Sequence, residues 1–172
     1  NISKSKRYSS FPKLAATLTE CDKAAINIVD GTTQHCKVNF GMDAMENMMT
    51  KEIPRELSVC AHVLNNDSGS LVINDLTKDD RTKHVFELNN PVINNTFPRF
   101  YAGSPIITSN GYILGSFCVF NSKPKSLDSS KVEGLRMLAD QFIDLYESTR
   151  SDYQRGSENT NPGQEKINGE YY

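Results

Sequence analysis

The sequence has no long hydrophobic run and no large excess of either charge. Its 172 residues include 19 lysines and arginines against 21 aspartates and glutamates, a formal net charge of −2. The only basic cluster, Lys4, Lys6 and Arg7, lies at the N-terminal end, so the composition indicates no nucleic-acid partner. No segment approaches the roughly 18 apolar residues of a membrane span, and no signal peptide is visible. We therefore expect a cytoplasmic protein with no membrane partner.

Closely spaced cysteines are also missing. Cys21, Cys36, Cys60 and Cys118 show no Cys-x-x-Cys spacing, which argues against a zinc site. Without a secretory signal we expect reduced thiols, each packed as a small hydrophobic residue beside an apolar run. His62 follows Cys60 by two positions, which on a helix separates the side chains by roughly 200°. We expect no catalytic Cys–His pair, no metal ion and no cofactor.

Length and composition predict one folded domain with polar flanks. A chain of 172 residues can bury a single core. We expect a disordered lead-in over 1–9, the folded domain over 10–149 and a disordered tail or linker over 150–172, because the tail has hardly any aliphatic residue. The first residue is Asn1 rather than Met, so a longer parent chain is a further expectation.

The most informative stretch is a pair of strand-like runs over 99–107 and 113–120. Both are rich in β-branched and aromatic residues, and the Ser-Asn-Gly sequence at 109–111 between them suits a tight turn. The pattern predicts a β-hairpin. Both faces of the second run are largely apolar, so helices should cover one face and loops or a ligand the other. Gly103 and Gly115 indicate close approach by a backbone or a ligand, or else simple helix-on-sheet packing.

Two amphipathic helices are predicted, one at each end of the domain. The first runs from Ser10 to about Thr19, with apolar residues at helical spacing. The second begins near Asp128 or Ser130, either of which can cap it, and carries a broad apolar stripe to Tyr146. This stripe is wide enough to pack on a sheet and on a second subunit. We therefore predict a homodimer formed through the terminal helices.

The segments between these helices contain further strands and short helices. A hairpin is predicted over 24–30 and 34–40. The methionine-rich segment 41–51 is expected to be irregular, either a lid over a cavity or core filling. The remaining segments are a short helix over 58–64, a strand over 71–73, a helical turn near 83–88 and a loop over 89–98.

The order of these elements, together with several short motifs, resembles the GAF domain family. The motifs are Ala25 to Asp30 followed by Gln34, Val59-Cys60-Ala61-His62, Val72-x-x-Asp75 with Asp80-Arg81, Arg99 to Pro105, and Gly111 to Val119. They resemble a subgroup with Cys-Ala-His and Arg-Phe-Tyr-Ala-Gly sequences that is frequent beside histidine kinases and cyclic-dinucleotide enzymes. The resemblance implies an α+β fold: a six-stranded antiparallel sheet with terminal helices on one face and pocket-forming loops on the other.

The resemblance also implies a sensory or regulatory domain, which binds a small molecule or dimerises to signal to an attached or partner protein such as a kinase. The Phe-x-x-x-Asp-Glu signature of cyclic-nucleotide-binding members is missing. Ala61 separates the cysteine and histidine that are adjacent in bilin-binding members, and only Cys60 lies near a cysteine position of the free methionine sulfoxide reductases. We therefore expect a non-catalytic domain. The alternatives are such a thiol-based reductase and a ligand-free scaffold for protein–protein interaction.

A ligand pocket is predicted between the central hairpin and the irregular segments that cover it. The expected lining residues are Phe40, Met49, Cys60, Tyr101 and Cys118, and the expected rim residues are Asp75, Arg81 and Arg99. In the alternative, Phe97, Phe100 and the methionines fill this space as a solid core. The rim carboxylates and guanidinium groups have an alternative role, which is to form ion pairs with one another and so stabilise the loops that carry them.

Overall fold

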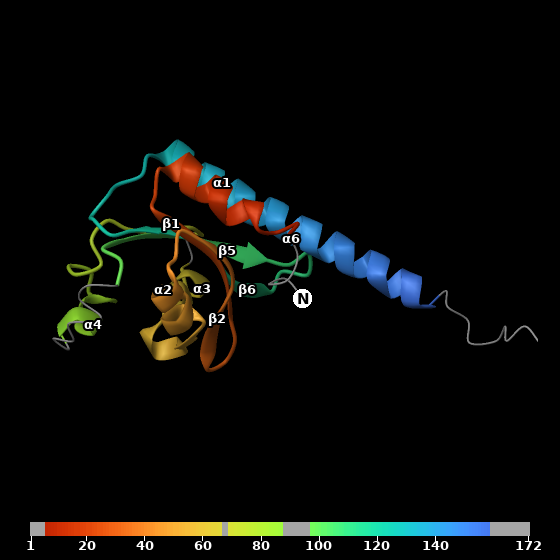
Figure 1. Ribbon diagram of the computed structural model, residues 1–172, viewed down its shortest axis with the longest axis horizontal. Helices are drawn as coiled ribbons and strands as arrows, with labels where there is room; N and C mark the ends of the chain where they lie inside the picture. The colour runs from red at the N-terminus through yellow and green to blue at the C-terminus, as the bar shows by residue number, and fades with distance from the viewer. Residues whose placement is uncertain (1–5, 67–68, 88–96, 159–172) are drawn as a thin grey trace, which may run out of the picture.

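The computed structural model describes residues 6–66, 69–87 and 97–158, and a central antiparallel sheet organises them (Figure 1). Six strands lie in the order β3-β2-β1-β6-β5-β4. The strands are β1 (Lys23–Val29), β2 (Thr33–Phe40), β3 (Glu52–Pro54), β4 (Leu71–Ile73), β5 (Phe100–Ile107) and β6 (Ile113–Asn121). The helices are α1 (Ser10–Thr19), α2 (Ala44–Thr50), the 3-10 helix η2 (Arg55–Leu57), α3 (Val59–Leu64), α4 (Lys83–Glu87) and α6 (Ser129–Glu158). The α+β architecture implied by the sequence is confirmed.

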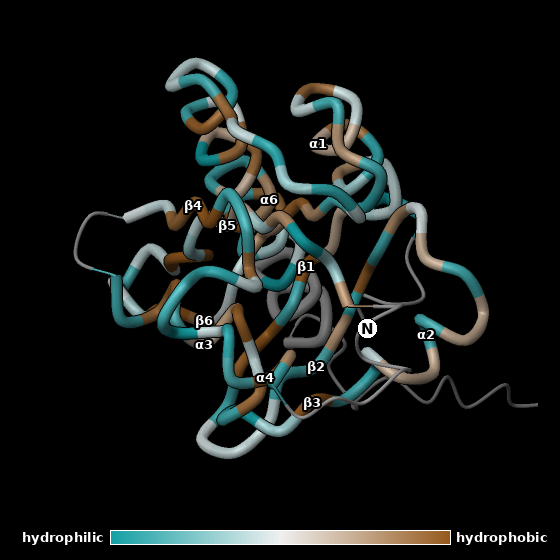
Figure 2. Tube along the Cα trace, turned by 90° about the vertical axis from the view of Figure 1, so that its left-hand side faces the viewer, coloured by the Kyte–Doolittle hydropathy of each residue, from teal (hydrophilic) through white to brown (hydrophobic). Residues whose placement is uncertain are grey.

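The two faces of the sheet are covered by different helices. α1 and α6 lie together over one face, and α2 and α3 lie on the other (Figure 1). Side chains alternate along a strand, so Phe117 and Val119 of β6 pack in the cluster that includes α1 and α6, whereas Cys118 packs in the cluster with α3. Hydrophobic residues accordingly run along the strands that lie between these layers (Figure 2). The central hairpin of β5 and β6 therefore contributes side chains to the hydrophobic clusters on both faces of the sheet.

An aromatic cluster fastens the N-terminal end to α6. Tyr8 is buried, with its ring centroid 5.6 Å from that of Phe142 and 6.2 Å from that of Tyr146. Phe11 of α1 also contacts the Phe142 ring edge-on, at 5.8 Å. The expectation of a disordered lead-in is therefore wrong for Tyr8, because burying an aromatic side chain stabilises the fold by roughly 1.5–3 kcal/mol. Residues 1–5 lie outside the described residues.

α6 is longer than the sequence pattern indicated. Asp128, rather than Ser130, provides its cap, since its Oδ1 accepts the Lys131 N–H at 2.9 Å. The helix then continues to Glu158, so its end passes the predicted boundary at 149. A polar composition does not stop a helix that has already formed, because Glu, Arg and Gln are good helix formers and extension is easy after nucleation. Residues 159–172 lie outside the described part of the chain.

The methionine-rich segment forms the helix α2, where the sequence predicted irregular structure. A capping box begins it: Asp43 Oδ1 accepts the Glu46 N–H at 2.9 Å, and Glu46 Oε2 accepts the Asp43 N–H at 3.0 Å. Met45 and Met48 are largely exposed. Since no residue of α2 is fully buried, this helix is a lid on the sheet and not part of its core.

Candidate ligand cavity

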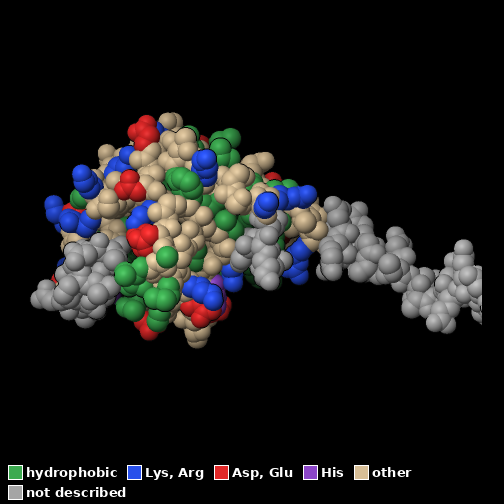
Figure 3. All heavy atoms as spheres, in the orientation of Figure 1, with side chains coloured by type: hydrophobic (Ala, Val, Ile, Leu, Met, Phe, Trp, Pro, Cys, Tyr) green, Lys and Arg blue, Asp and Glu red, His purple; other side chains and the backbone are tan. Residues whose placement is uncertain are grey.

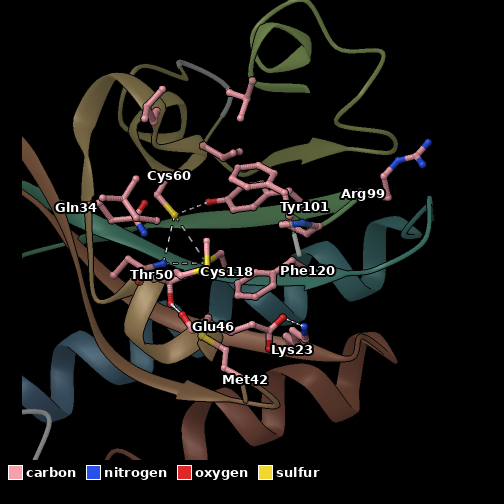
Figure 4. Close-up of a pocket in the computed structure, with 18 of the residues that line it drawn as sticks. Lys23, Gln34, Met42, Glu46, Thr50, Cys60, Arg99, Tyr101, Cys118 and Phe120 are labelled. Carbon is pink, nitrogen blue, oxygen red and sulfur yellow. Dashed lines mark hydrogen bonds and ion pairs between the residues drawn. The ribbon is translucent and has the colours of Figure 1, made fainter. Parts of the chain in front are cut away.

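A cavity of about 430 Å³ lies on the face of the sheet opposite α1 and α6 (Figure 4). Strands β1, β5 and β6 form its floor, and α2, β3, the start of α3 and the chain before β5 form its walls. This volume is typical of small-molecule sites, which span roughly 300–1,000 Å³. Its lining mixes apolar, polar and thiol groups and includes Met42, Met49, Ile53, Val59, Phe97, Tyr101, Phe120, Lys23, Asn27, Gln34, Glu46, Thr50, Arg99, Cys60 and Cys118.

Two free thiols meet at the floor of this cavity. The Sγ atoms of Cys60 and Cys118 are 3.9 Å apart. Asn27 Nδ2 donates to both sulfurs at 3.3 Å. Tyr101 Oη donates to Cys60 Sγ, also at 3.3 Å (Figure 4). Tyr101 Oη lies in addition 2.9 Å from Ser116 Oγ. A buried polar network thus joins residues from β1, α3, β5 and β6.

The network gives the two thiols different acidities. Hydrogen bonds from Cys118, Tyr101 and Asn27 lower the pKa of Cys60, although burial acts in the opposite direction. Burial raises the pKa of Cys118, and its neighbour Cys60 raises it further. Donors that point at a sulfur stabilise its thiolate. Cys60 is therefore the thiol of the pair that ionises first.

The position of Cys60 depends on a contact between β2 and the start of α3. Ser58 caps α3 by accepting the Ala61 N–H at 3.1 Å. The same Ser58 hydroxyl donates to Gln34 Oε1 at 2.5 Å, and both side chains are buried. Gln34 therefore holds the helix end, and with it Cys60, over the sheet.

Asn27 presents an acceptor without a partner. It lies in the middle of β1 and is 3% exposed, and its Oδ1 makes no hydrogen bond within the described part of the chain. An unsatisfied buried acceptor costs about 1–3 kcal/mol. A hydrogen-bond donor on a molecule in the cavity would remove that cost. Asn27 is thus the feature of this site that most directly indicates a ligand.

Charged side chains around the cavity are paired with one another. Lys23 of β1 forms an ion pair with Glu46 of α2, which attaches the lid to the sheet (Figure 4). Arg99 Nε and Nη2 donate to the two carboxylate oxygens of Asp75, each at 3.2 Å. The Arg99 guanidinium and the Thr77 hydroxyl hold the pKa of Asp75 down at about 2. Because each positive charge is matched by a carboxylate, neither Lys23 nor Arg99 brings an unpaired charge to the cavity.

Other kinds of site find no support in the described residues. No group of three or more His, Cys, Asp or Glu side chains there is placed to hold a metal ion. None of the described helices is both long and apolar enough to cross a membrane. On the face shown in Figure 3, basic and acidic side chains are interspersed rather than gathered by sign.

The family assignment rests on a match over most of the chain. Residues 11–143 fit the GAF domain model, and these residues include every strand and the cavity lining named above. The chain belongs to the GAF domain family.

Known proteins that resemble this chain differ in their named activities. Over 102 residues the chain is 33% identical to a cyclic di-GMP phosphodiesterase of Pseudomonas aeruginosa; the match covers 59% of this chain and 16% of that protein. A domain of a two-component sensor histidine kinase from Sinorhizobium meliloti superposes with a TM-score of 0.64 at 14% identity, covering 87% and 95% of the two chains. Free methionine-R-sulfoxide reductase from Neisseria meningitidis superposes with 0.62 at 16%, covering 88% and 84%. The structural likenesses establish the fold alone.

The GAF cavity contains most of the predicted lining residues. Met49, Cys60, Tyr101 and Cys118 line it, and Arg99 lies at its edge. Asp75 and Arg81 are not among the lining residues. Arg99 binds Asp75, and Arg81 binds Asp79 through two hydrogen bonds of 2.8 and 2.7 Å. Placing them at the rim was wrong because their hydrogen bonds tie them to the loop itself, as the structural alternative for these groups proposed.

Phe40 was also predicted to line the cavity, and this is wrong. It pairs with Ala24 across β1 and β2, and Ala24 packs in the cluster with α1 and α6. Cross-strand partners share a face of the sheet, so Phe40 belongs to the other side. The register shifts next to Asn27, where Ile26 pairs with Val38 and Asn27 with Cys36. A bulge of this kind changes which residues face the cavity.

Several important residues of the GAF cavity were missed. Asn27 carried a usable signal, because it is a polar residue inside an otherwise apolar strand. The sequence singles out Gln34 only as part of a motif. Lys23 and Glu46 carried no signal in the sequence, since their pairing depends on how α2 folds back onto β1.

Proposed function

We propose that this GAF domain is a non-catalytic sensory or regulatory module that binds a small molecule in its cavity and signals to an attached or partner protein such as a kinase. The observation that carries the proposal is Asn27 Oδ1, which has no hydrogen-bond partner among the described residues and lies in a cavity of about 430 Å³. The similar proteins named above include a sensor kinase domain and a cyclic di-GMP phosphodiesterase, which supports a role in signalling.

The chemistry of the cavity favours a neutral molecule with an apolar body. Lys23 is paired with Glu46, and Arg99 with Asp75, so neither pair calls for a charged ligand. Met42, Met49 and Phe120 offer apolar contacts. Asn27 Oδ1 calls for a donor, so we expect a ring or amide N–H, or a hydroxyl group, on the ligand.

A route from the cavity to α6 passes through the sheet. Cys118 lines the cavity, and its neighbours Phe117 and Val119 point to the opposite face, where α6 packs. α6 spans 30 residues, about 45 Å at 1.5 Å per residue, and projects past the end of the sheet (Figure 1). A ligand that shifts β6 would therefore also shift the part of α6 that packs on the sheet, and with it the projecting end of this helix.

The binding proposal is tested by thermal shift with a panel of neutral heterocyclic compounds that carry a ring N–H. We expect at least one compound to raise the Tm through preferential binding to the folded state. The shift should disappear in Asn27→Leu and persist in Asn110→Leu, an exposed asparagine in the β5–β6 turn. A panel without a stabilising compound, or a shift that survives Asn27→Leu, contradicts the proposal.

A thiol-based free methionine sulfoxide reductase is the enzymatic alternative. The close pair of free thiols in the cavity favours it. Incubation with free methionine-R-sulfoxide and a thioredoxin system decides between the two. We expect no turnover, whereas turnover that is lost in Cys60→Ser would overturn the non-catalytic assignment.

We also propose that two copies pair through α1 and α6. Leu14 and Leu18 of α1 and Met137 of α6 are exposed by 54%, 42% and 57%. Leu18 also packs against Gly134, where a Cβ atom would crowd the leucine side chain. These positions make an apolar surface where the two helices meet, and a second copy would cover it by two-fold symmetry.

A further inference from the structure

Two thiols that are far apart in the sequence come together at the floor of the cavity. Cys60 belongs to α3 and Cys118 to β6, and their sulfurs are 3.9 Å apart. A disulfide bond is about 2.05 Å long, so the sulfurs must approach by roughly 2 Å. We propose that Cys60 and Cys118 are a redox site, which closes to an intramolecular disulfide when a small peroxide enters the cavity.

The surroundings of the two sulfurs give them different roles. Cys60 Sγ accepts hydrogen bonds from Tyr101 Oη and Asn27 Nδ2, each at 3.3 Å, and has the Cys118 thiol as a third neighbour. The hydrogen bond with Cys118, followed by those from Tyr101 and Asn27, lowers the pKa of Cys60, while burial raises that of Cys118. The thiolate is the nucleophilic form of cysteine. Cys60 therefore attacks the oxidant, and Cys118 is the resolving thiol.

The reaction balances with hydrogen peroxide as the only oxidant. The Cys60 thiolate attacks one peroxide oxygen, the O–O bond breaks, and the leaving hydroxide takes a proton to become water. Cys60 is then a sulfenic acid. The Cys118 sulfur attacks the Cys60 sulfur, the S–O bond breaks, and the departing hydroxide takes the Cys118 proton. Two thiols and one peroxide thus give one disulfide and two waters, and a dithiol returns the two electrons.

The cavity distinguishes this pair from the other cysteines. Cys60 and Cys118 both line the cavity, but Cys118 is fully buried and Cys60 is 4% exposed, so a peroxide in the cavity meets Cys60 first. Cys21 packs in the cluster with α1 and α6, on the opposite side of the sheet. Cys36 is half-buried, and burial raises its pKa as it does that of Cys21. Neither Cys21 nor Cys36 lines the cavity.

Oxidation would change the cavity and its connection to α6. The disulfide would fasten α3 to β6 and remove the thiolate that Tyr101 and Asn27 stabilise. β6 packs on α6 through its other face. β6 would then transmit the redox state of the cavity to α6, and under the proposed function it would also transmit the binding of a ligand.

The test uses the full chain with Cys21→Ser and Cys36→Ser, which leaves Cys60 and Cys118 as its only cysteines. The protein is treated with hydrogen peroxide, its remaining thiols are alkylated, and its intact mass is measured. We expect both thiols to disappear together with a loss of two hydrogens, and both to return with dithiothreitol. Non-reducing electrophoresis should show a monomer band, since the bond is intramolecular. Thiols that stay reduced in the folded protein, or covalent dimers, contradict the proposal.

Single substitutions in that background separate the two roles. Cys118→Ser should stop at the sulfenic acid of Cys60, which dimedone traps, whereas Cys60→Ser should leave Cys118 reduced under the same treatment. Circular dichroism melting verifies that each variant is folded. Dimedone labelling of Cys118 in place of Cys60 would reverse the assignment.

Tyr101→Phe tests the donor to Cys60, because it removes the hydroxyl and keeps the ring. A hydrogen bond to a charged group is strong enough to change the thiolate fraction about tenfold. We expect the oxidation rate at neutral pH to fall about tenfold and its pH profile to move upward by about one unit. Tyr112→Phe, an exposed tyrosine in the β5–β6 turn, is the matched control. An unchanged profile in Tyr101→Phe would exclude this role.

Because no step needs the cavity ligand or methionine sulfoxide, the result is independent of the two assays of the proposed function.

Discussion

The hydroxyl of Tyr101 occupies the space that a side chain at Gly103 would fill. A Cβ atom built on Gly103 would collide with Tyr101 Oη and lie 2.7 Å from Ser116 Oγ. Residues two apart on a strand share a face, so the missing side chain lets the Tyr101 ring lie along β5. From there its hydroxyl reaches Ser116 and Cys60.

Gly103→Ala is therefore expected to push the Tyr101 hydroxyl out of the thiol network. Overpacking in a closed core costs about 1–3 kcal/mol of the free energy of unfolding, which urea titration measures. Gly31→Ala is the control, because a Cβ atom there has no neighbour within 4 Å. Equal stability of the two variants would show that Tyr101 is not confined by Gly103.

The ion pair between Asp75 and Arg99 predicts a pH-dependent contribution to stability. Asp75 has a folded-state pKa of about 2 against an ordinary value of 3.8. Since the folded-state pKa is the lower one, the contribution is complete above about pH 4 and is lost as the pH falls towards 2. The pair is partly exposed, so we expect about 1 kcal/mol or less.

Urea titrations of wild type and Arg99→Gln between pH 5 and 2 measure the contribution of this ion pair to the free energy of unfolding. The difference in unfolding free energy between the two proteins should shrink as the pH falls. A difference that stays constant over this range would mean that the pair does not stabilise the folded state through the Asp75 charge.

Cys118→Phe tests whether the cavity is open space. Cys118 and its neighbour Val119 are both fully buried, but Cys118 lines the cavity and Val119 packs in the cluster on the opposite face. We expect Cys118→Phe to lose less than about 1 kcal/mol and Val119→Phe to lose roughly 1–3 kcal/mol through overpacking. Chemical denaturation of both variants measures these values. Comparable losses would indicate that the space above Cys118 is filled.

Substitution at the α1–α6 surface tests the proposed dimer. Met137→Asp places a charge on the exposed apolar surface of α6, and burying an unpaired charge between subunits is costly. We expect light scattering at high micromolar concentration to show a dimer for wild type and a monomer for Met137→Asp. Met48→Asp, on the exposed side of α2, should remain dimeric. A monomeric wild type would refute this interface.

Local patterns allowed much of the fold to be predicted. α1 lies where the helical spacing placed it, and β4 occupies the predicted 71–73. The turn before β6 contains Gly111 at a φ of +82°, which the Ser-Asn-Gly sequence anticipated. α2 could have been found as well, because Asp43 and Glu46 have capping-box spacing. Its methionines, which suit several packing roles, concealed that signal.

The amino-acid sequence by itself determined which segments become strands and helices and which family their order matches, since periodicity, turns and caps act between near neighbours. Only the tertiary structure decided the site. Asn27, Cys60, Tyr101 and Cys118 come from separate elements, and their meeting depends on strand order and on how α3 crosses the sheet. The face on which Phe40 lies depends on a register shift between β1 and β2. Such a shift arises from the pairing of two strands, and neither strand encodes it alone.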